Sequence, residues 1–217
     1  MGVFIRRSTG RRLRAAKPAV AAGLALAAIV AAACGGSVAS RTASTPSTES
    51  PRAAFPLTAI DDDGVRVTIA ARPRRIVTFA PSNTEIVFAL GLGNDVVGVS
   101  GKFDDYPPGA RSVARIGGAG EFGADPNVEK VVALRPDLMI TISGGDQWKQ
   151  RLRDLGVAVF TVDATGFADL LGDIRTIGRI TGVPERAAAL AEGMEAREAA
   201  VQRAVAGDPR VSCFFEA

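Results

Sequence analysis

The sequence predicts an α/β protein in which a mostly parallel sheet is flanked by helices and followed by one long α-helix. Two observations predict this fold. Short apolar runs rich in Val and Ile alternate, from residue 75 onward, with stretches of helical period. Of the 217 residues, 47% are hydrophobic, so a buried core is expected. Strands that alternate with helices form right-handed crossovers, so the strands lie parallel and helices cover both faces of the sheet.

Residues 1–33 are predicted to form a lipoprotein signal peptide. Six basic residues and no acid lie within residues 1–17, and residues 18–33 carry no charge. A bilayer span needs about 20 apolar residues, whereas the apolar part of a signal peptide needs roughly 7 to 15. The small residues before Cys34 resemble a lipobox, so Cys34 is predicted to carry a lipid after cleavage. The alternative is a transmembrane anchor in which Cys34 is an inert small residue.

Residues 34–55 are rich in Ser, Thr, Ala and Pro and are predicted to form a flexible tether. A tether that follows a lipidated cysteine predicts an exported protein, anchored at the extracytoplasmic face of the cell membrane. Removing the signal peptide changes the net charge from +3 to −3, because 20 basic residues then face 23 acidic ones. A mildly acidic chain without a basic stripe gives little support to a nucleic-acid partner.

The α/β lobe is predicted to span residues 56–183 and to begin with a β-hairpin. Two alternating runs, at 57–60 and 65–70, flank the sequence "DDDG". These aspartates could be calcium ligands, but the spacing and the glutamate of a calcium loop are missing. We therefore expect Asp61, Asp62 and Asp63 to form a solvated turn.

The remaining elements alternate as a parallel sheet requires. Ser82 is expected to cap the first helix, with Glu85 completing a capping box, and Pro126 and Pro184 each begin a helix. The helix at 184–207 would span roughly 35 Å. Residues 208–217 read as the first strand of a further lobe that this chain does not hold. In order, the elements are strand 75–80, helix 82–91, strand 96–100, a weak strand 112–116, helix 126–135, strand 137–143, helix 146–156, strand 157–162, helix 167–181 and helix 184–207.

The composition argues against an enzyme. The chain has no histidine, which removes the commonest general base and a frequent metal ligand. A Ser/His/Asp triad is therefore excluded. We expect no catalytic residue, no metal site and no cofactor.

Four motifs carry a resemblance to a known family. The segments "RRIVTFAPSNTEIVFALGLGNDVVGVS", "DDYPPGA", "PNVEKVVALRPDLMI" and "LGVAVFTVDA", in this order, resemble the substrate-binding lipoproteins of ABC importers for cobalamin and iron siderophores. The resemblance implies two α/β lobes joined by one long helix, with the ligand between them. It also implies that Glu129 docks the lobe onto arginines of the permease. The alternative is that Glu129 only stabilises the first turn of its helix through the helix dipole.

The ligand is expected at the carboxyl ends of the strands, where open parallel sheets bind ligands. Aromatic faces with a few polar groups suit a corrinoid, a siderophore or a haem-like molecule. Phe103 lies where the resemblance places a pocket aromatic, just before the "DYPP" motif, and ordinary packing is the alternative for each aromatic. Because one lobe contacts only one face of a ligand, we expect weak or absent binding by this chain alone. The candidate ligand residues are Ser82, Asn83, Phe103, Tyr106, Phe122 and Trp148.

Two other functions are considered. Gly118, Gly120 and Gly123 fit the spacing G-x-G-x-x-G, with Asp146 further on, so a Rossmann-type dinucleotide-binding protein is one alternative. Against it, Asp125 and Pro126 place the helix start after the glycines rather than among them. A structural lipoprotein that binds no ligand is the other alternative. Capture of a corrinoid or a ferric siderophore would distinguish a receptor from both.

Overall fold

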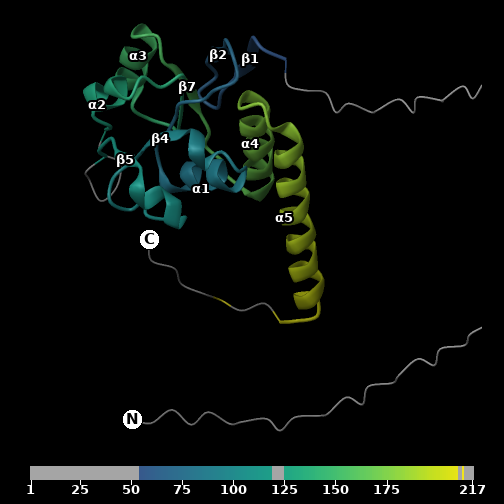
Figure 1. The fold of residues 1–217 in the computed structure, drawn as a ribbon. Coiled ribbons are helices and arrows are strands. Elements are labelled where there is room, and N and C mark those ends of the chain that lie inside the picture. Colours follow the sequence, from purple (N-terminus) through teal and green to yellow (C-terminus); the bar gives the residue numbers. More distant parts are fainter. Residues whose placement is uncertain (1–53, 119–124, 210–211, 213–217) are drawn as a thin grey trace, which may run out of the picture. The chain divides into compact units, whose positions relative to one another are not determined.

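Five parallel strands form the central sheet in the order β5-β4-β3-β6-β7 (Figure 1). The structure, a computed structural model, describes residues 54–118, 125–209 and 212. Ile76 of the central strand lies opposite Val96 on one side and Leu138 on the other. The α/β class and the parallel sheet predicted from the sequence are confirmed. The strands are β3 (Ile76–Thr78), β4 (Val96–Val99), β5 (Ala114–Arg115), β6 (Leu138–Thr141) and β7 (Ala158–Thr161).

The helices and the hairpin follow the predicted order with shorter bounds. An antiparallel pair, β1 (Leu57–Ile60) and β2 (Arg66–Ile69), forms the predicted hairpin. Two 3-10 turns, at Gly93–Asp95 and Pro108–Ser112, precede β4 and β5. The expected strand at 208–217 lies mostly outside the described residues. The helices are α1 (Pro81–Ala89), α2 (Val128–Ala133), α3 (Asp146–Asp154), α4 (Phe167–Ile180) and α5 (Pro184–Val205).

Alternate residues of β6 enter two separate cores. Leu138 and Ile140 of β6 belong to a cluster that includes residues of α1, α4 and α5, while Met139 belongs to a second cluster with residues of α2 and α3. This alternation follows from the two-residue period of a strand, and it buries both faces of the sheet. The sequence of β6 is apolar throughout for this reason.

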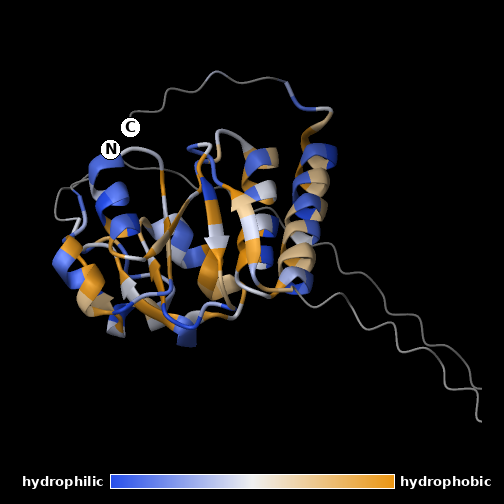
Figure 2. Cartoon of the chain, turned by 90° about the horizontal axis from the view of Figure 1, so that it is seen from above, coloured by the Kyte–Doolittle hydropathy of each residue, from blue (hydrophilic) through white to orange (hydrophobic). Residues whose placement is uncertain are grey.

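Helix α5 packs on α4 along its first half and then continues past it (Figure 1). Gly178 of α4 lets the helices approach closely, because a Cβ atom at this position would lie 2.1 Å from the Cβ of Ala187. Hydrophobic and hydrophilic residues alternate along the whole of α5 (Figure 2). Among the described residues, no helix has both the length and the apolar character needed to cross a membrane.

Candidate functional site

The strand order places a crevice at the centre of the sheet. From β3 the chain passes to β4 and β5 on one side and later to β6 and β7 on the other. The loops that leave the carboxyl ends of β3 and β6 therefore diverge. Crevices at such a reversal of strand order are where open α/β sheets bind ligands.

Two adjacent hollows lie at this end of the sheet and share Ser82, Ile86 and Leu170; we call them together the α1 groove. The smaller has a volume of about 380 Å³ and is lined by residues that follow β3, β6 and β7. The larger, about 600 Å³, lies among α1, α4, α5 and Tyr106. Its further lining is mostly apolar and consists of Glu85, Phe88, Ala89, Pro107, Ile174, Leu190 and Met194.

Ser82 and Asn83 stand at the start of α1, and the start differs from the prediction. The helix begins at Pro81, its N-cap is Ala80, and no side chain caps it, so the predicted Ser82 capping box is wrong. Proline at the first helical position sets the helical φ by itself. Ser82 is thus free of capping and lies exposed on the shared wall of the α1 groove.

Asn83 is almost fully buried, and its Nδ2 donates to the carbonyl of Phe79 at 3.0 Å. This bond holds the turn from β3 into α1. Ala80, inside that turn, has a φ of +98°, a conformation that costs energy for a residue with a side chain. Asn83 therefore fixes the shape of the groove wall and lines the smaller hollow.

Phe103 and Tyr106 are exposed by 52% and 61%, on the loop that follows β4. Tyr106 lines the larger hollow. The Phe103 ring lies under Lys102, whose Nζ is 4.9 Å from the ring centroid. Two aromatic faces are thus open to contact at the carboxyl edge, as the sequence predicts, while their contact with a ligand remains a prediction.

A buried carboxylate that sequence reasoning missed anchors this aromatic loop. Asp104 has no exposed surface, and its Oδ2 accepts hydrogen bonds from Thr84 Oγ1 at 2.9 Å and from Ser100 Oγ at 2.7 Å. The Arg115 guanidinium donates to the carbonyls of Gly101 and Asp104. No local pattern marks Asp104, because its partners come from α1 and β4. These hydrogen bonds fix the loop backbone, while the rings of Phe103 and Tyr106 remain exposed.

Trp148 is a core residue. It lies in the first turn of α3, is only 7% exposed, and its ring centroid is 5.6 Å from that of Phe79. A Cβ atom at Gly145 would lie 2.0 Å from the indole Nε1, so the ring is enclosed on this side as well. Trp148, predicted as a ligand residue, lines neither hollow of the α1 groove. Its spacing to Leu152, four residues on in the same helix, was the signal for a buried position.

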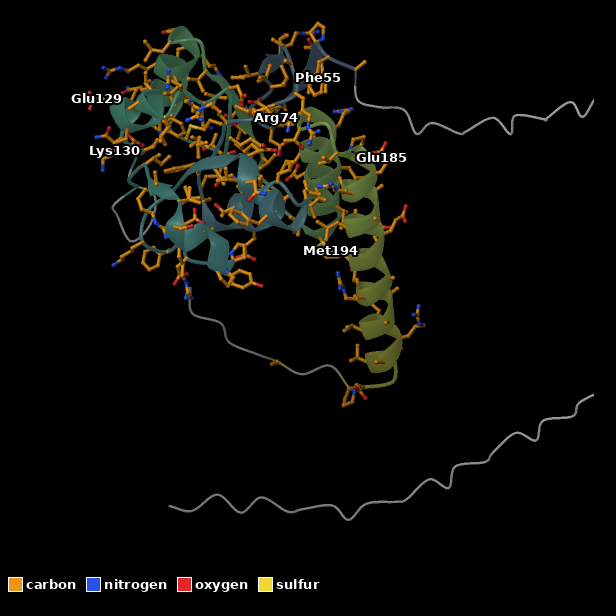
Figure 3. All side chains as sticks on the ribbon, viewed as in Figure 1. Phe55, Arg74, Glu129, Lys130, Glu185 and Met194 are labelled. Carbon is orange, nitrogen blue, oxygen red and sulfur yellow. The ribbon has the colours of Figure 1, made fainter. Side chains whose placement is uncertain are left out.

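Glu129 is exposed in the first turn of α2 and lies, with Lys130, at the outer side of the lobe away from α5 (Figure 3). The helix starts later than predicted, because Asn127 caps it by accepting a hydrogen bond from the Lys130 backbone N–H at 2.8 Å. Exposure fits both docking and a dipole effect, so the docking role remains a prediction. Phe122 and Cys34 lie outside the described residues.

The acidic turn between β1 and β2 is solvated only in part: Asp62 and Asp63 are exposed, as predicted, whereas Asp61 is not. Asp61 is buried and accepts hydrogen bonds from the backbone N–H groups of Val65, at 2.7 Å, and Thr161, at 3.2 Å. Asp63 accepts from Lys149 Nζ at 2.6 Å and from Thr161 Oγ1 at 2.7 Å. The fully buried Lys149 ammonium and the outer edge of β7 need partners, and the turn supplies them.

The β1–β2 turn contains a carboxyl group with a shifted pKa and also fixes a loop of the α1 groove. Burial alone would raise the pKa of Asp63, but the hydrogen bonds from Lys149 and Thr161 and the charges of Lys149 and Arg153 lower it overall. Asp62 Oδ2 accepts a hydrogen bond from the backbone N–H of Asp163 at 2.7 Å, which fixes the loop that lines the smaller hollow.

Asp173 of α4 lines the same hollow, and its pKa is raised to about 7. Burial is the largest cause, followed by the negative charges of Asp62, Asp169 and Asp163 and a hydrogen bond with Asp62. This carboxyl therefore changes charge near neutral pH. Among the described residues, no group of three or more His, Cys, Asp or Glu side chains is arranged to hold a metal ion.

A third hollow, of about 720 Å³, lies at the opposite edge of the sheet. Arg75, Val96, Ser112 and Ala114, which precede or begin strands, are among its lining residues. It thus lies at the amino ends of the strands, where the fold does not favour ligand binding. It offers a matched surface for control substitutions.

The comparison with known proteins identifies the family. Residues 76–216, well over half of the chain, match the family described as "Periplasmic binding protein". The chain belongs to the periplasmic binding protein family. As a class, periplasmic binding proteins bind substrates for transport and are not enzymes. This supports the solute-binding interpretation over a dinucleotide-binding protein or a structural lipoprotein.

Curated periplasmic binding proteins resemble the chain over about half of their length. An uncharacterized ABC transporter substrate-binding lipoprotein of Bacillus subtilis, YvrC, is 36% identical over 170 residues, which cover 75% of this chain and 52% of the relative. A vitamin B12-binding protein of Salmonella typhimurium is 32% identical over 152 residues, which cover 69% of this chain and 54% of the relative. The chain thus spans about half the length of the curated relatives it matches.

Solved periplasmic binding proteins share the fold. The heme binding protein HmuT superposes with a TM-score of 0.60 at 25% identity, covering 74% of this chain and 52% of that protein. An ABC-type Fe3+-hydroxamate transport system from Saccharomonospora viridis superposes with a TM-score of 0.58 at 28% identity, covering 70% of this chain and 57% of that protein.

Proposed function

We propose that the chain is the ligand-binding lobe of an extracytoplasmic receptor that delivers a corrinoid, siderophore or haem-like ligand to an ABC permease and catalyses no reaction. The observation that carries the proposal is the α1 groove, a largely apolar hollow at the reversal point of a parallel sheet, beside an exposed aromatic loop. Relatives named for vitamin B12, heme and Fe3+-hydroxamate support this ligand class.

Within the groove, each predicted residue has a distinct proposed role. Tyr106 in the larger hollow supplies a flat apolar face, and Ser82 supplies a hydroxyl on the wall that both hollows share. Phe103 lines neither hollow but offers a second apolar face on the same loop as Tyr106. Asn83 acts indirectly, because its amide is occupied by the Phe79 carbonyl. Phe122 remains a candidate by sequence alone.

We propose that α5, predicted as an inter-lobe helix over 184–207, continues into a second lobe that begins near residue 208 and closes over the groove. Two observations support this. The second half of α5 exposes Val201 and Val205 by 62% and 51%, and the curated relatives are about twice as long as the matched region. Of the weak or absent binding expected for a single lobe, we propose weak binding, with a dissociation constant between about 1 μM and about 1 mM.

We propose that Cys34 carries a lipid and that residues 34–55 hold the lobe away from the membrane. The support is the sequence pattern around Cys34 and the printed description of the Bacillus subtilis relative as a lipoprotein. Mass spectrometry of the exported protein tests this: a diacylglycerol-modified Cys34 at the mature N-terminus is expected, and an unmodified chain that begins at Met1 would contradict it.

We propose that Glu129 docks the lobe on the permease. An exposed carboxylate opposite a basic pocket sets the orientation of two partners and speeds their encounter more than it adds affinity. Glu129→Arg is expected to lower permease-dependent uptake while leaving ligand binding unchanged. Glu192→Arg, on the exposed side of α5, is the matched control. Unchanged uptake with Glu129→Arg would contradict the docking role.

Equilibrium dialysis tests the proposed function, because corrinoids and ferric siderophores are coloured. The purified full chain in detergent is dialysed against cyanocobalamin, hemin, or a ferric trihydroxamate or tricatecholate. We expect saturable retention of at least one of these ligands. Ser82→Tyr, which fills the shared wall of the groove, should abolish retention.

The control for this experiment is Ser112→Tyr, which fills the hollow at the amino ends of the strands and should leave retention unchanged. Retention lost equally in both variants would place the ligand elsewhere. No saturable retention of any of the four ligands up to millimolar concentration would contradict the proposed function.

A further inference from the structure

The charged side chains that line the α1 groove are all acidic. Glu85 lines the larger hollow, and Asp163 and Asp173 line the smaller one. Neither lining includes a lysine or an arginine. The remaining lining is apolar or carries neutral polar groups such as Ser82, Asn83 and Thr165.

More negative charge lies directly behind the smaller hollow. Asp62 binds the Asp163 backbone from the β1–β2 turn, and Asp169 lies in the first turn of α4. Asp169 Oδ2 accepts a hydrogen bond from Thr165 Oγ1 at 2.5 Å. The β7 end of the groove thus gathers four carboxyl groups on three different segments.

The cations nearest this end are directed at other partners. The Lys149 ammonium is buried against Asp63, and the Arg153 guanidinium lies 3.5 Å from Asp61 Oδ2. Arg115 donates to backbone carbonyls of the loop after β4, at the other end of the carboxyl edge. Lys102 lies over Phe103 on that same loop. The charged groups that act on Asp173 are all acids, so its part of the wall keeps its negative character.

This distribution of charge has a consequence for the ligand. A carboxylate or phenolate group of a ligand placed near Asp163 would be desolvated beside like charges, which costs several kcal/mol and opposes binding. A neutral chelate meets only the apolar lining, and an ammonium group would gain a charged partner.

We infer, on the premise of the receptor function proposed above, that this groove selects neutral or cationic metal chelates, a ferric trihydroxamate or a cobalamin, and rejects polyanionic ones such as ferric tricatecholates. A cationic arm of the ligand lies against Asp163 and Asp173, while the chelate itself lies on the apolar part of the groove near Tyr106.

The titration of Asp173 adds a pH dependence to this selection. The charged groups that act on Asp173 come from the β1–β2 turn (Asp62), from the loop after β7 (Asp163) and from α4 itself (Asp169), and all are acids. Burial, and then these acids, raise its pKa to about 7, so the Asp173 carboxyl is mostly neutral at about pH 6 and mostly ionised at about pH 8. Affinity for a cationic chelate should therefore rise over this range, while that for a neutral chelate should not.

The experiment compares ligands of different charge on the full chain in detergent by NMR titration, which measures weak binding. There are four probes. Ferrioxamine B is a monocationic trihydroxamate, ferrichrome is a neutral trihydroxamate, ferric enterobactin is a trianionic tricatecholate, and the fourth probe is cyanocobalamin. Gallium replaces iron in the three siderophores. We expect ferrioxamine B, ferrichrome or cyanocobalamin to bind at least roughly tenfold more tightly than the tricatecholate.

Two variants identify the groups responsible. Asp163→Asn removes the charge of a side chain that makes none of the described hydrogen bonds. Asp173→Asn removes a carboxyl group but keeps a hydrogen-bond donor toward Asp62. Together they should weaken binding of ferrioxamine B by roughly threefold to tenfold and leave ferrichrome unchanged. Asp208→Asn, on an exposed residue beyond α5, is the matched control and should change neither.

The outcomes separate this inference from the proposed function. The charge selection would be overturned if the tricatecholate bound most tightly, or if Asp163→Asn and Asp208→Asn had equal effects on binding of a cationic chelate. Either result would leave the proposed receptor function standing. Binding of none of the four probes would contradict the proposed function, and the charge selection with it.

Discussion

The two halves of α5 differ in what covers them. In the first half, residues 184–194, Ala187 and Ala191 are fully buried against the lobe, and Met194 lies on the side that faces it (Figure 3). In the second half, residues 195–205, no residue is buried. Hydrophobic residues nevertheless recur along both halves (Figure 2). A periodic pattern therefore identifies an apolar face of a helix without identifying what packs on it.

The largest expected effect comes from placing a charge on each half. Ala191→Asp would bury an unpaired carboxylate between α5 and the lobe and should lower the free energy of unfolding by about 3–5 kcal/mol. Val201→Asp should change it by less than about 0.5 kcal/mol, because the residue is exposed. Urea unfolding of the full chain in both variants measures the difference. Equal losses would show that the second half is packed in solution.

Glycine replacements sharpen the same comparison. Gly178→Ala places a methyl group 2.1 Å from the Ala187 Cβ, so the helices must separate, and we expect a loss of about 2 kcal/mol. Gly193→Ala has no atom closer than 3.9 Å to the added Cβ and should raise stability by about 0.5–1 kcal/mol, because alanine favours the helix. Thermal unfolding followed by circular dichroism measures both. A stabilising Gly178→Ala would contradict the described packing of α4 on α5.

The groove side of α4 should differ from its α5 side in its response to pH. The pKa of Asp173 is raised from 3.8 to about 7, so the native state binds this proton more tightly than the unfolded chain does. Its contribution to stability is therefore greatest below about pH 4 and is lost as the pH rises to about 7. Asp173→Asn should raise stability at pH 8 by about 1–2 kcal/mol, allowing for solvent screening, and change it little at pH 4. A uniform effect at both pH values would contradict the assigned titration.

The smallest expected effect lies where the two halves of α5 meet. Arg175 of α4 and Glu195 of α5 form an ion pair at 2.7 Å with side chains that are 44% and 46% exposed. A double-mutant cycle with alanine should give a coupling energy of about 0.3 kcal/mol, which falls in high salt. A coupling energy above about 1.5 kcal/mol would show that this end of the interface is more strongly held than its exposure implies.

The order of elements, the parallel sheet and the two covered faces were predictable, because they depend on local patterns such as the apolar run of β6. The contacts that shape the groove were not. Asp61 and Asp63 looked like a solvated turn because their partners, Thr161 and Lys149, lie far away in sequence. Asp104 was missed because one of its partners, Thr84, belongs to α1 and lies 20 residues away in sequence.

Two predictions, the Ser82 cap and the exposed position of Trp148, failed for reasons that are visible in the local sequence. Pro81 favours a helix start one residue before Ser82, which removes the need for a capping side chain. Trp148 lies four residues before Leu152 on a helix, and both are buried in one cluster. Helical spacing to another apolar residue, rather than residue type, therefore distinguishes an aromatic residue of the core from one on a loop.

The central claim is that ligand binds at the carboxyl ends of the strands, in the α1 groove. Backbone amide NMR of the full chain during titration with cyanocobalamin and gallium ferrichrome tests it most directly, since weak binding still shifts resonances. The account predicts shifts concentrated at Ser82, Tyr106 and Asp163 and absent at Ser112 and Ala114. Shifts centred on the hollow at the amino ends of the strands would contradict it.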